Sequence, residues 1–347
     1  YGASANAFTS FTRTAYLFSA TDHIKESTNT LLDFVQQPYF TEQTVNKEKG
    51  IIGQEIQMYD DQPDWRVYFG SIENLYHEHP VKIDIAGTVE SIDGITAEHL
   101  YTCYNTFYHP SNMLLFAIGN VDPEEMMQTI RDNQQTKTFA APQPINRIHV
   151  EEASDVAVKE RTLEMDVLKP KAYVSFKARE VSLQGAEMMK HELAIQLALD
   201  LLYGRSSAFY EEVYQQGWID ESYSYDFSLE EGFGFAMVGS DTAYPTELIA
   251  AMKKVMEDAA VQLPFTQEDL DRVKRRKIGF NLRALNSIEF IANQFTRYKF
   301  NDMNLFDIVP VIEELTIADV EQALTSITGE SQQSVFTINP LTKEAQA

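Results

Sequence analysis

The sequence has a single cysteine, Cys103, among 347 residues. One cysteine excludes an internal disulfide and favours a reducing compartment, so we expect a cytoplasmic protein in which Cys103 is a small core residue. No apolar run reaches the roughly 18 residues of a membrane-spanning helix. Basic residues are scarce as well, with 28 Lys and Arg against 52 Asp and Glu and a formal net charge of −24. This charge argues against nucleic acid and membrane partners and favours neutral or basic ones.

Several catalytic motifs are also missing. The chain has no Gly-x-Ser-x-Gly elbow, no P-loop and no dinucleotide fingerprint. His191 and Glu192 begin a His-Glu-x-x-His motif, but residue 195 is Ile, so the second helix-face zinc ligand is absent. The His77-Glu78-His79 trio precedes a proline, and we predict a loop there in preference to a metal site.

A repeated stretch organises the chain. Phe40–Ile56 (FTEQTVNKEKGIIGQEI) resembles Phe265–Leu282 (FTQEDLDRVKRRKIGFNL), and each copy opens with a Thr suited to cap a helix. The similarity continues from Thr96–Asn120 to Thr316–Asn339, where a helical pattern is followed by an apolar strand pattern. The repeat predicts an α+β fold of two homologous domains, each a mainly antiparallel sheet covered by helices.

The repeat also sets the expected domain limits. We predict a first domain at residues 1–135, a linker at 136–160 and a second domain at 161–347. Residues from about 162 to 225 have no counterpart in the first half. The first domain is therefore expected to lack its opening strands and first helix, as in an N-terminally truncated chain.

Local patterns place the main elements of both halves. We expect strands at Phe11–Ser19 and Met113–Ile118, the second of them buried, and a helix that Pro63 begins. In the second half, an apolar helix around residues 191–202 precedes a hairpin of the strands YSYDFSL and FGFAMVG.

Two glutamates distinguish the two copies of the repeat. Glu48 aligns with Val273 and Glu55 with Phe280, so only the first copy has carboxylates at these positions. At about 100° per residue, both glutamates fall between two apolar sets on the helix, which predicts a half-buried face. Solvated glutamates are the ordinary alternative. A buried carboxylate, by contrast, needs a cation or hydrogen-bond donors to remain charged.

The chain resembles the M16 family of zinc metallopeptidases, which includes pitrilysin, insulinase and the mitochondrial processing peptidase, and is similar to its short two-domain bacterial branch. The resemblance covers essentially the whole chain. Four stretches carry it: ANAFTSFTRTAY, EKGIIGQE, HPVKIDIAGTVESI and FYHPSNMLLFAIGNVDPE. It implies two α/β-roll domains of the LuxS/MPP-like metallohydrolase fold.

The resemblance also implies a zinc site. Members have an inverted His-x-x-Glu-His motif that supplies two ligands and a general base, and a later glutamate that supplies the third ligand. Glu55 matches this metal ligand, and Glu48 matches a supporting carboxylate of the catalytic site. Zinc in such a site acidifies a bound water for attack on a peptide carbonyl. The inverted motif itself is absent from these 347 residues, and the family spacing places it before Tyr1.

Substrate and partner contacts follow from the same resemblance. Asn6 and Ala7 match an edge-strand pair that holds a peptide substrate as an added β-strand. Single-chain members also have an Arg and a Tyr seven residues apart, but here Tyr214 and Trp218 or Ile219 occupy those places. A companion M16 subunit or a second copy of the chain is therefore expected to complete the enzyme.

The function predicted from these observations is that of a zinc-dependent endopeptidase subunit that hydrolyses flexible peptides. As given, without the inverted motif, the chain is expected to be inactive and to hold no stoichiometric zinc. The alternative is a non-catalytic M16 homologue that acts as a structural or peptide-binding subunit. The two glutamates favour the enzyme, because a subunit without metal has no reason to keep carboxylates at both positions.

Overall fold

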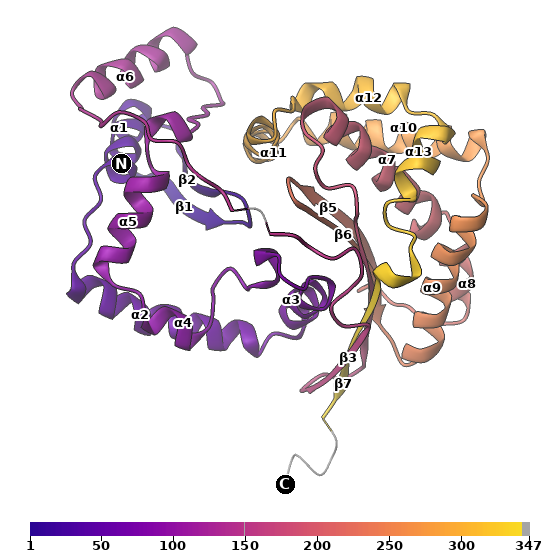
Figure 1. The fold of residues 1–347 in the computed structure, drawn as a ribbon. Helices are drawn as coiled ribbons and strands as arrows, with labels where there is room; N and C mark the ends of the chain where they lie inside the picture. The colour runs from indigo at the N-terminus through magenta and orange to yellow at the C-terminus, as the bar shows by residue number, and fades with distance from the viewer. Residues whose placement is uncertain (149, 342–347) are drawn as a thin grey trace. The chain divides into compact units, whose positions relative to one another are not determined.

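The computed structural model describes residues 1–148 and 150–341, which form two compact units (Figure 1). One unit contains Tyr1–Gln57 and Ile85–Ile148. The other contains Met58–Asp84 together with the described residues after position 148. Residues 58–84 therefore pack with the second half of the chain, although the sequence repeat assigns them to the first.

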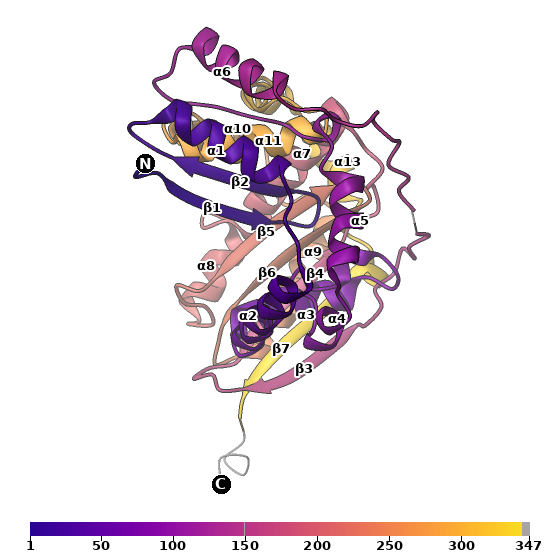
Figure 2. The same cartoon turned by 90° about the vertical axis from the view of Figure 1, so that its left-hand side faces the viewer.

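The first unit combines one β-hairpin with helices. Its elements are β1 (Ser4–Thr9), β2 (Thr14–Ser19), α1 (Ile24–Gln36), α2 (Glu42–Asp60, which ends in the second unit), α4 (Val89–Asp93), α5 (Ala97–Phe107), the 3₁₀ turn η2 (Pro110–Asn112) and α6 (Pro123–Gln135). The antiparallel β1–β2 hairpin lies beside α1 (Figure 2). Asp33 of α1 forms an ion pair of 2.7 Å with Lys137, which follows the end of α6.

The strand predicted at Met113–Ile118 is not present, and this prediction was wrong. The segment has no regular secondary structure and is only half buried or exposed. Its counterpart in the second half, β7 (Gln333–Pro340), is flanked by the two strands β3 (Glu160–Met165) and β4 (Lys171–Lys177). Within the described part of the first unit, no strand takes the place of β3 or β4. Without a partner for its backbone hydrogen bonds, an apolar segment does not become a strand.

Cys103 lies on α5 and is exposed, so the prediction that it is a core residue was also wrong. The helix buries Ala97 and partly buries Leu100 and Tyr104, which lie on a different face. Aromatic neighbours along the sequence therefore did not indicate on which side of the helix Cys103 lies.

The second unit contains a five-stranded sheet with helices on both faces (Figure 1). Its other elements are α3 (Pro63–Leu75), η1 (Pro80–Lys82), α7 (Gly185–Tyr203), α8 (Ala208–Gln215), β5 (Ser224–Glu230), β6 (Phe233–Asp241), α9 (Pro245–Val261), α10 (Gln267–Ala284), α11 (Ile288–Phe300), η3 (Leu305–Asp307), α12 (Ile308–Glu314), α13 (Ile317–Leu324) and η4 (Glu330–Gln332). The strand order is β3-β7-β4-β6-β5, with β3 parallel to β7 and all other pairs antiparallel.

Successive side chains of a strand point to opposite faces of this sheet, and different helices pack on the two faces. Val174 and Phe176 of β4 point into the main core, where helix α7 packs against α10, α12 and α13. Phe336 and Ile338 of β7 point to the opposite face and pack against Val67 of α3. Helix α3 thus covers the face of the sheet that α7 leaves open.

Gly70 allows α3 to approach the sheet closely. A Cβ atom added at Gly70 would lie 2.2 Å from a ring carbon of Phe336. A larger residue at this position would push the helix away from β7 or displace the ring. Only glycine fits at this contact.

The two halves repeat the same order of elements, which confirms the repeat inferred from the sequence. Helices α2 and α10, α3 and α11, and the turns η1 and η3 each begin 225 positions apart. The hairpin β1–β2 corresponds to β5–β6, α1 to α9, α4 to α12 and α5 to α13. Only the second unit has elements in the place of β3, β4, α7 and α8 within the described residues. Among these residues, no helix is both long enough and apolar enough to span a membrane.

Candidate functional site

Helix α2 carries both candidate glutamates, and local hydrogen bonds determine its start. The Thr41 hydroxyl oxygen accepts a hydrogen bond from the Thr44 amide at 3.1 Å, and the Thr44 hydroxyl oxygen accepts one from the Thr41 amide at 3.0 Å. This reciprocal pair satisfies amides at the helix N-terminus. The predicted cap is confirmed, and in the second copy Thr266 caps α10 in the same way.

The glutamates lie on an open face of α2. Val45 and Ile56, on the predicted apolar stripe, are buried at 6% exposure each. Glu48 and Glu55 are both exposed, and so are the neighbouring apolar residues Ile51 and Met58. The expected half-buried face was therefore wrong for this structure, because no described element covers these side chains.

The described residues do not complete a zinc site. Glu48 and Glu55 are seven residues apart, so their backbones are about 10 Å apart along the helix axis and on nearly one face. A zinc ion has ligands at about 2 Å, so one glutamate can bind it directly while the other supports the site. Among residues 1–148 and 150–341, no group of three or more His, Cys, Asp or Glu side chains is arranged to hold a metal.

The equivalent place in the second half is occupied by a core contact and an ion pair. Val273 of α10, equivalent to Glu48, is 1% exposed in the core that contains α7, whereas Phe280, equivalent to Glu55, is exposed. Asp200 of α7 pairs with Arg276 of α10 at 2.7 Å and accepts a hydrogen bond from the Tyr225 hydroxyl. Burial, together with the nearby Asp200 charge, raises the pKa of Tyr225 to about 12. Helix α7 thus pairs with α10 through charge and apolar contact.

Asn6 and Ala7 lie on β1, where both are exposed. Strand β1 pairs with β2, with Asn6 opposite Leu17 and Ala7 opposite Tyr16. In the described part of the chain no other strand pairs with β1, which leaves one edge of the strand open. The Asn6 side-chain oxygen accepts a hydrogen bond from the Ala7 amide at 2.9 Å. The role of these two residues in binding substrate stays a prediction.

The His77-Glu78-His79 trio forms a loop, as predicted, and its backbone binds a carboxylate. The amides of these residues donate to the Glu152 side chain at 2.8, 2.8 and 2.7 Å. Lys177, which is buried, donates to the same carboxylate at 2.6 Å. Burial alone would raise the pKa of Glu152, but the hydrogen bonds from Lys177 and the three amides outweigh it and lower the pKa to about 2. The loop therefore holds an internal anion.

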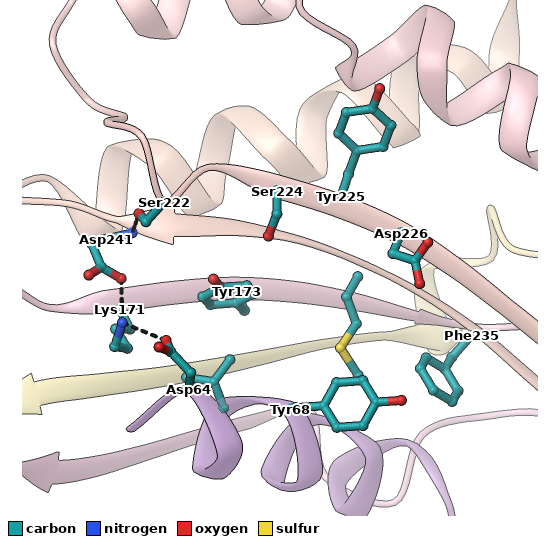
Figure 3. A pocket seen from close by; sticks show the side chains of 12 residues that line it. Asp64, Tyr68, Lys171, Tyr173, Ser222, Ser224, Tyr225, Asp226, Phe235 and Asp241 are labelled. Atoms are coloured by element: carbon teal, nitrogen blue, oxygen red, sulfur yellow. Dashed lines mark hydrogen bonds and ion pairs between the residues drawn. The ribbon is translucent and has the colours of Figure 1, made fainter. Parts of the chain in front are cut away.

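A cavity of about 440 Å³ lies between α3 and the sheet of the second unit, and no sequence motif indicates it. Figure 3 shows two ends of different chemistry. At one end, Lys171 is bound by Asp64 and Asp241, each at 2.7 Å. At the other end lie three side chains, Tyr68 of α3, Phe235 of β6 and Asp226 of β5. The alternation in YSYDFSL, which puts Asp226 on the face opposite Phe227, was the available signal.

Comparison with protein-family models identifies the relatives of this chain. Residues 1–89 match the family described as insulinase (peptidase family M16), and residues 94–277 match the family described as the peptidase M16 inactive domain. The second match alone covers more than half of the chain.

The chain belongs to the M16 peptidase family.

Two relatives support the membership across nearly the whole chain. The uncharacterized zinc protease YmfH of Bacillus subtilis (strain 168) is 54% identical over 323 residues, which are 93% of this chain and 75% of that protein. The crystal structure of an M16-like peptidase from Alicyclobacillus acidocaldarius has a TM-score of 0.94 at 35% identity. The match covers 98% of this chain and 81% of that one.

A more distant relative is a subunit of a complex. The probable mitochondrial-processing peptidase subunit beta of Arabidopsis thaliana is 29% identical over 131 residues, which are 38% of this chain and 25% of that protein. The M16 membership and the structural match confirm the predicted family and the α+β fold class, with open and mainly antiparallel sheets. The name of the Bacillus relative describes a zinc protease. Among the described residues of this M16 chain, no group of three or more His, Cys, Asp or Glu side chains could hold a metal ion.

Proposed function

We propose that this chain is the metal-side subunit of a zinc-dependent M16 endopeptidase that acts on flexible peptides in the cytoplasm. Glu55 is the proposed zinc ligand and Glu48 the supporting carboxylate, while Asn6 and Ala7 on β1 are proposed to hold the substrate. The supporting observation is the asymmetry of the repeat. Carboxylates occupy positions 48 and 55 of α2, whereas α10 has Val273 and Phe280 at the equivalent positions.

The other ligands of such a site are not grouped with Glu55 among residues 1–148 and 150–341. No His-x-x-Glu-His sequence occurs among them. The chain is thus proposed to contribute one ligand to a zinc site that residues other than the described ones complete. No catalytic step is assigned to the described residues on this basis.

The decisive experiment compares matched variants of the full-length protein. Replacing Glu55 with Gln removes the charged ligand, so zinc content and cleavage of a quenched fluorescent peptide should both be lost. Glu48→Gln should weaken zinc affinity or activity by about 10- to 100-fold, the usual effect of losing a supporting partner. Phe280→Gln, at the exposed equivalent of Glu55, is the control and should change neither. A Glu55→Gln protein that stays folded, zinc-loaded and active contradicts the proposal.

A second chain is part of the proposed enzyme. Residues 208–219 contain no arginine, and an M16 relative is named as a subunit of a processing peptidase. A companion M16 chain or a second copy would supply the missing substrate contacts. If a second copy supplies them, specific activity should rise with protein concentration, and if a companion does, activity should appear only on its addition. Full activity of a dilute monomer would exclude both arrangements.

The other candidate function is a non-catalytic M16 subunit that binds peptides or stabilises a complex. It is favoured by the match of residues 94–277 to the inactive domain family and by the absence of a three-ligand cluster among the described side chains. Metal analysis of the full-length wild-type protein separates the two candidate functions. Peptide binding without zinc and without cleavage would favour the non-catalytic subunit.

A further inference from the structure

We propose that the cavity between α3 and the sheet binds the arginine side chain of a peptide, through Asp226 and the rings of Tyr68 and Phe235. The proposed function enters only in the choice of a peptide as the carrier of the arginine. The site itself lies wholly in the second unit, is formed by α3, β4, β5 and β6, and requires no metal.

The charge in the cavity is unevenly distributed. The ammonium group of Lys171 lies 2.7 Å from Asp64 and 2.7 Å from Asp241, so its charge is compensated twice. Asp226 forms no ion pair with any described residue, and Arg297 pairs instead with Glu192 and Glu230. Burial raises the pKa of Asp226, and the hydrogen bond from the Phe227 amide and the nearby charges of Lys277 and Arg297 offset only part of this rise. The Asp226 end of the cavity is therefore open to an added cation, and the Lys171 end has no free positive charge for an anion.

The aromatic side chains at the same end suit a guanidinium group. The rings of Tyr68 and Phe235 have centroids 6.2 Å apart and an interplanar angle of 67°. Phe235 is 2% exposed and forms a fixed wall, whereas Tyr68 is 37% exposed and reachable from solvent. Arginine combines a planar cation that stacks on aromatic rings with a fork of donors that binds a carboxylate.

Tyr68 lies close enough to Asp226 for the carboxylate charge to act on its phenol. Burial, together with the Asp226 charge, raises the pKa of Tyr68 to about 12. The phenol is therefore neutral at neutral pH and presents an uncharged ring to a cation. The cavity volume of about 440 Å³ lies within the range of about 300–1,000 Å³ that is usual for small ligands, and it accommodates a single side chain.

Binding to the 347-residue protein tests this proposal without zinc or activity. The probe is a short fluorescein-labelled glycine–serine peptide with one central arginine, and its partner has citrulline, which has the same shape without the charge. Fluorescence anisotropy should show about tenfold tighter binding of the arginine peptide. Equal affinities of the two peptides would overturn the proposal while leaving the peptidase assignment intact. Conversely, if Glu55 proved not to bind zinc, the expected difference in affinity between the two peptides would remain.

Two substitutions locate the binding. Asp226→Asn should bring the ratio of the two affinities close to one, whereas Asp258→Asn, which removes an exposed carboxylate of α9, should preserve it. A preserved ratio in Asp226→Asn would place the arginine elsewhere and overturn the proposal.

A second variant keeps the test decisive if Asp226→Asn does not fold. Tyr68→Leu removes one ring at a partly exposed position and should weaken binding of the arginine peptide severalfold, with the citrulline peptide unaffected. Competition by N-acetyl-arginine amide against the labelled peptide should also occur with the wild-type protein. An absence of competition, or equal affinity of the wild-type protein and Tyr68→Leu for the arginine peptide, would refute the site.

Discussion

Helices α2 and α10 occupy equivalent positions in the repeat, yet the surroundings of their equivalent residues differ. Val273 of α10 is 1% exposed because it lies in the core of the second unit with α7. Glu48 of α2 is exposed, and among the described residues of the first unit no helix takes the place of α7. A position on a helix thus acquires its role from the element that packs against it, and the same fold supports a core contact in one half and exposed carboxylates in the other.

Exchanging the side chains at equivalent positions of α2 and α10 gives the largest expected effect on stability. Val273→Glu puts a carboxylate into an apolar core and should lower the free energy of unfolding by about 3 kcal/mol or more. The reciprocal change, Glu48→Val, replaces an exposed side chain and should alter it by less than about 0.5 kcal/mol. Urea titration followed by circular dichroism measures both. Equal stability of the two variants would show that positions 48 and 273 do not differ in burial.

Glu152 anchors the loop that follows α3 by accepting hydrogen bonds from three of its backbone amides. Glu152→Gln should lower the free energy of unfolding at pH 7. The depressed pKa of Glu152, about 2, corresponds at most to roughly 3 kcal/mol, and screening at this partly exposed carboxylate reduces the effect to about 2 kcal/mol.

The pH dependence of this effect has a defined sign. Because the folded protein lowers the pKa, the stabilisation is complete above the ordinary pKa near 4.5 and is lost as the pH falls toward about 2. The difference between wild type and Glu152→Gln should therefore shrink over that interval. A difference that stays constant from pH 7 to pH 2 would mean that the loop is held by other contacts.

Gly70 tests how closely α3 approaches the sheet. Gly70→Ala would place a Cβ atom 2.2 Å from the Phe336 ring and should lower the free energy of unfolding by about 2 kcal/mol through overpacking. Thermal unfolding monitored by circular dichroism detects the loss. Addition of Phe336→Leu, which shortens the opposing side chain, should recover part of the loss, and no recovery would argue against the contact.

Gly50 of α2 provides the smallest expected effect, with the opposite sign. Within the described residues nothing lies within 4 Å of a Cβ added there. Gly50→Ala should therefore raise the stability of the helix by about 0.5–1 kcal/mol, because alanine is the better helix former. The increase is measured in the same thermal unfolding experiment. A decrease would show that another part of the protein packs on this face of α2.

Local signals in the sequence predicted much of the fold correctly. Thr41 and Thr266 begin their helices as expected, Pro63 begins α3, and the strands YSYDFSL and FGFAMVG form the hairpin of β5 and β6. These features depend on hydrogen bonds and backbone preferences within a few residues, so they can be read from short stretches.

Errors arose where a partner distant in sequence decides the outcome. Residues 113–118 have the composition of a strand but no neighbouring strand in the described first unit, and Cys103 lies on the open side of its helix. Glu48 and Glu55 lie on the predicted side of α2, but their exposure depends on what covers that side. The cavity beside α3 escaped prediction because its walls come from segments more than a hundred residues apart.

The sequence by itself determined the repeat, the order of the elements, the helix starts and the M16 resemblance, along with the two carboxylates that only the first copy has. These properties depend on side-chain identity and on spacing along the chain. Only the tertiary structure decided that residues 58–84 join the second unit, that Glu152 binds the loop after α3, and that Asp226 faces Tyr68 across a cavity. The physical reason is that burial, ion pairing and strand pairing depend on distances through space, which the folded chain sets between residues far apart in sequence.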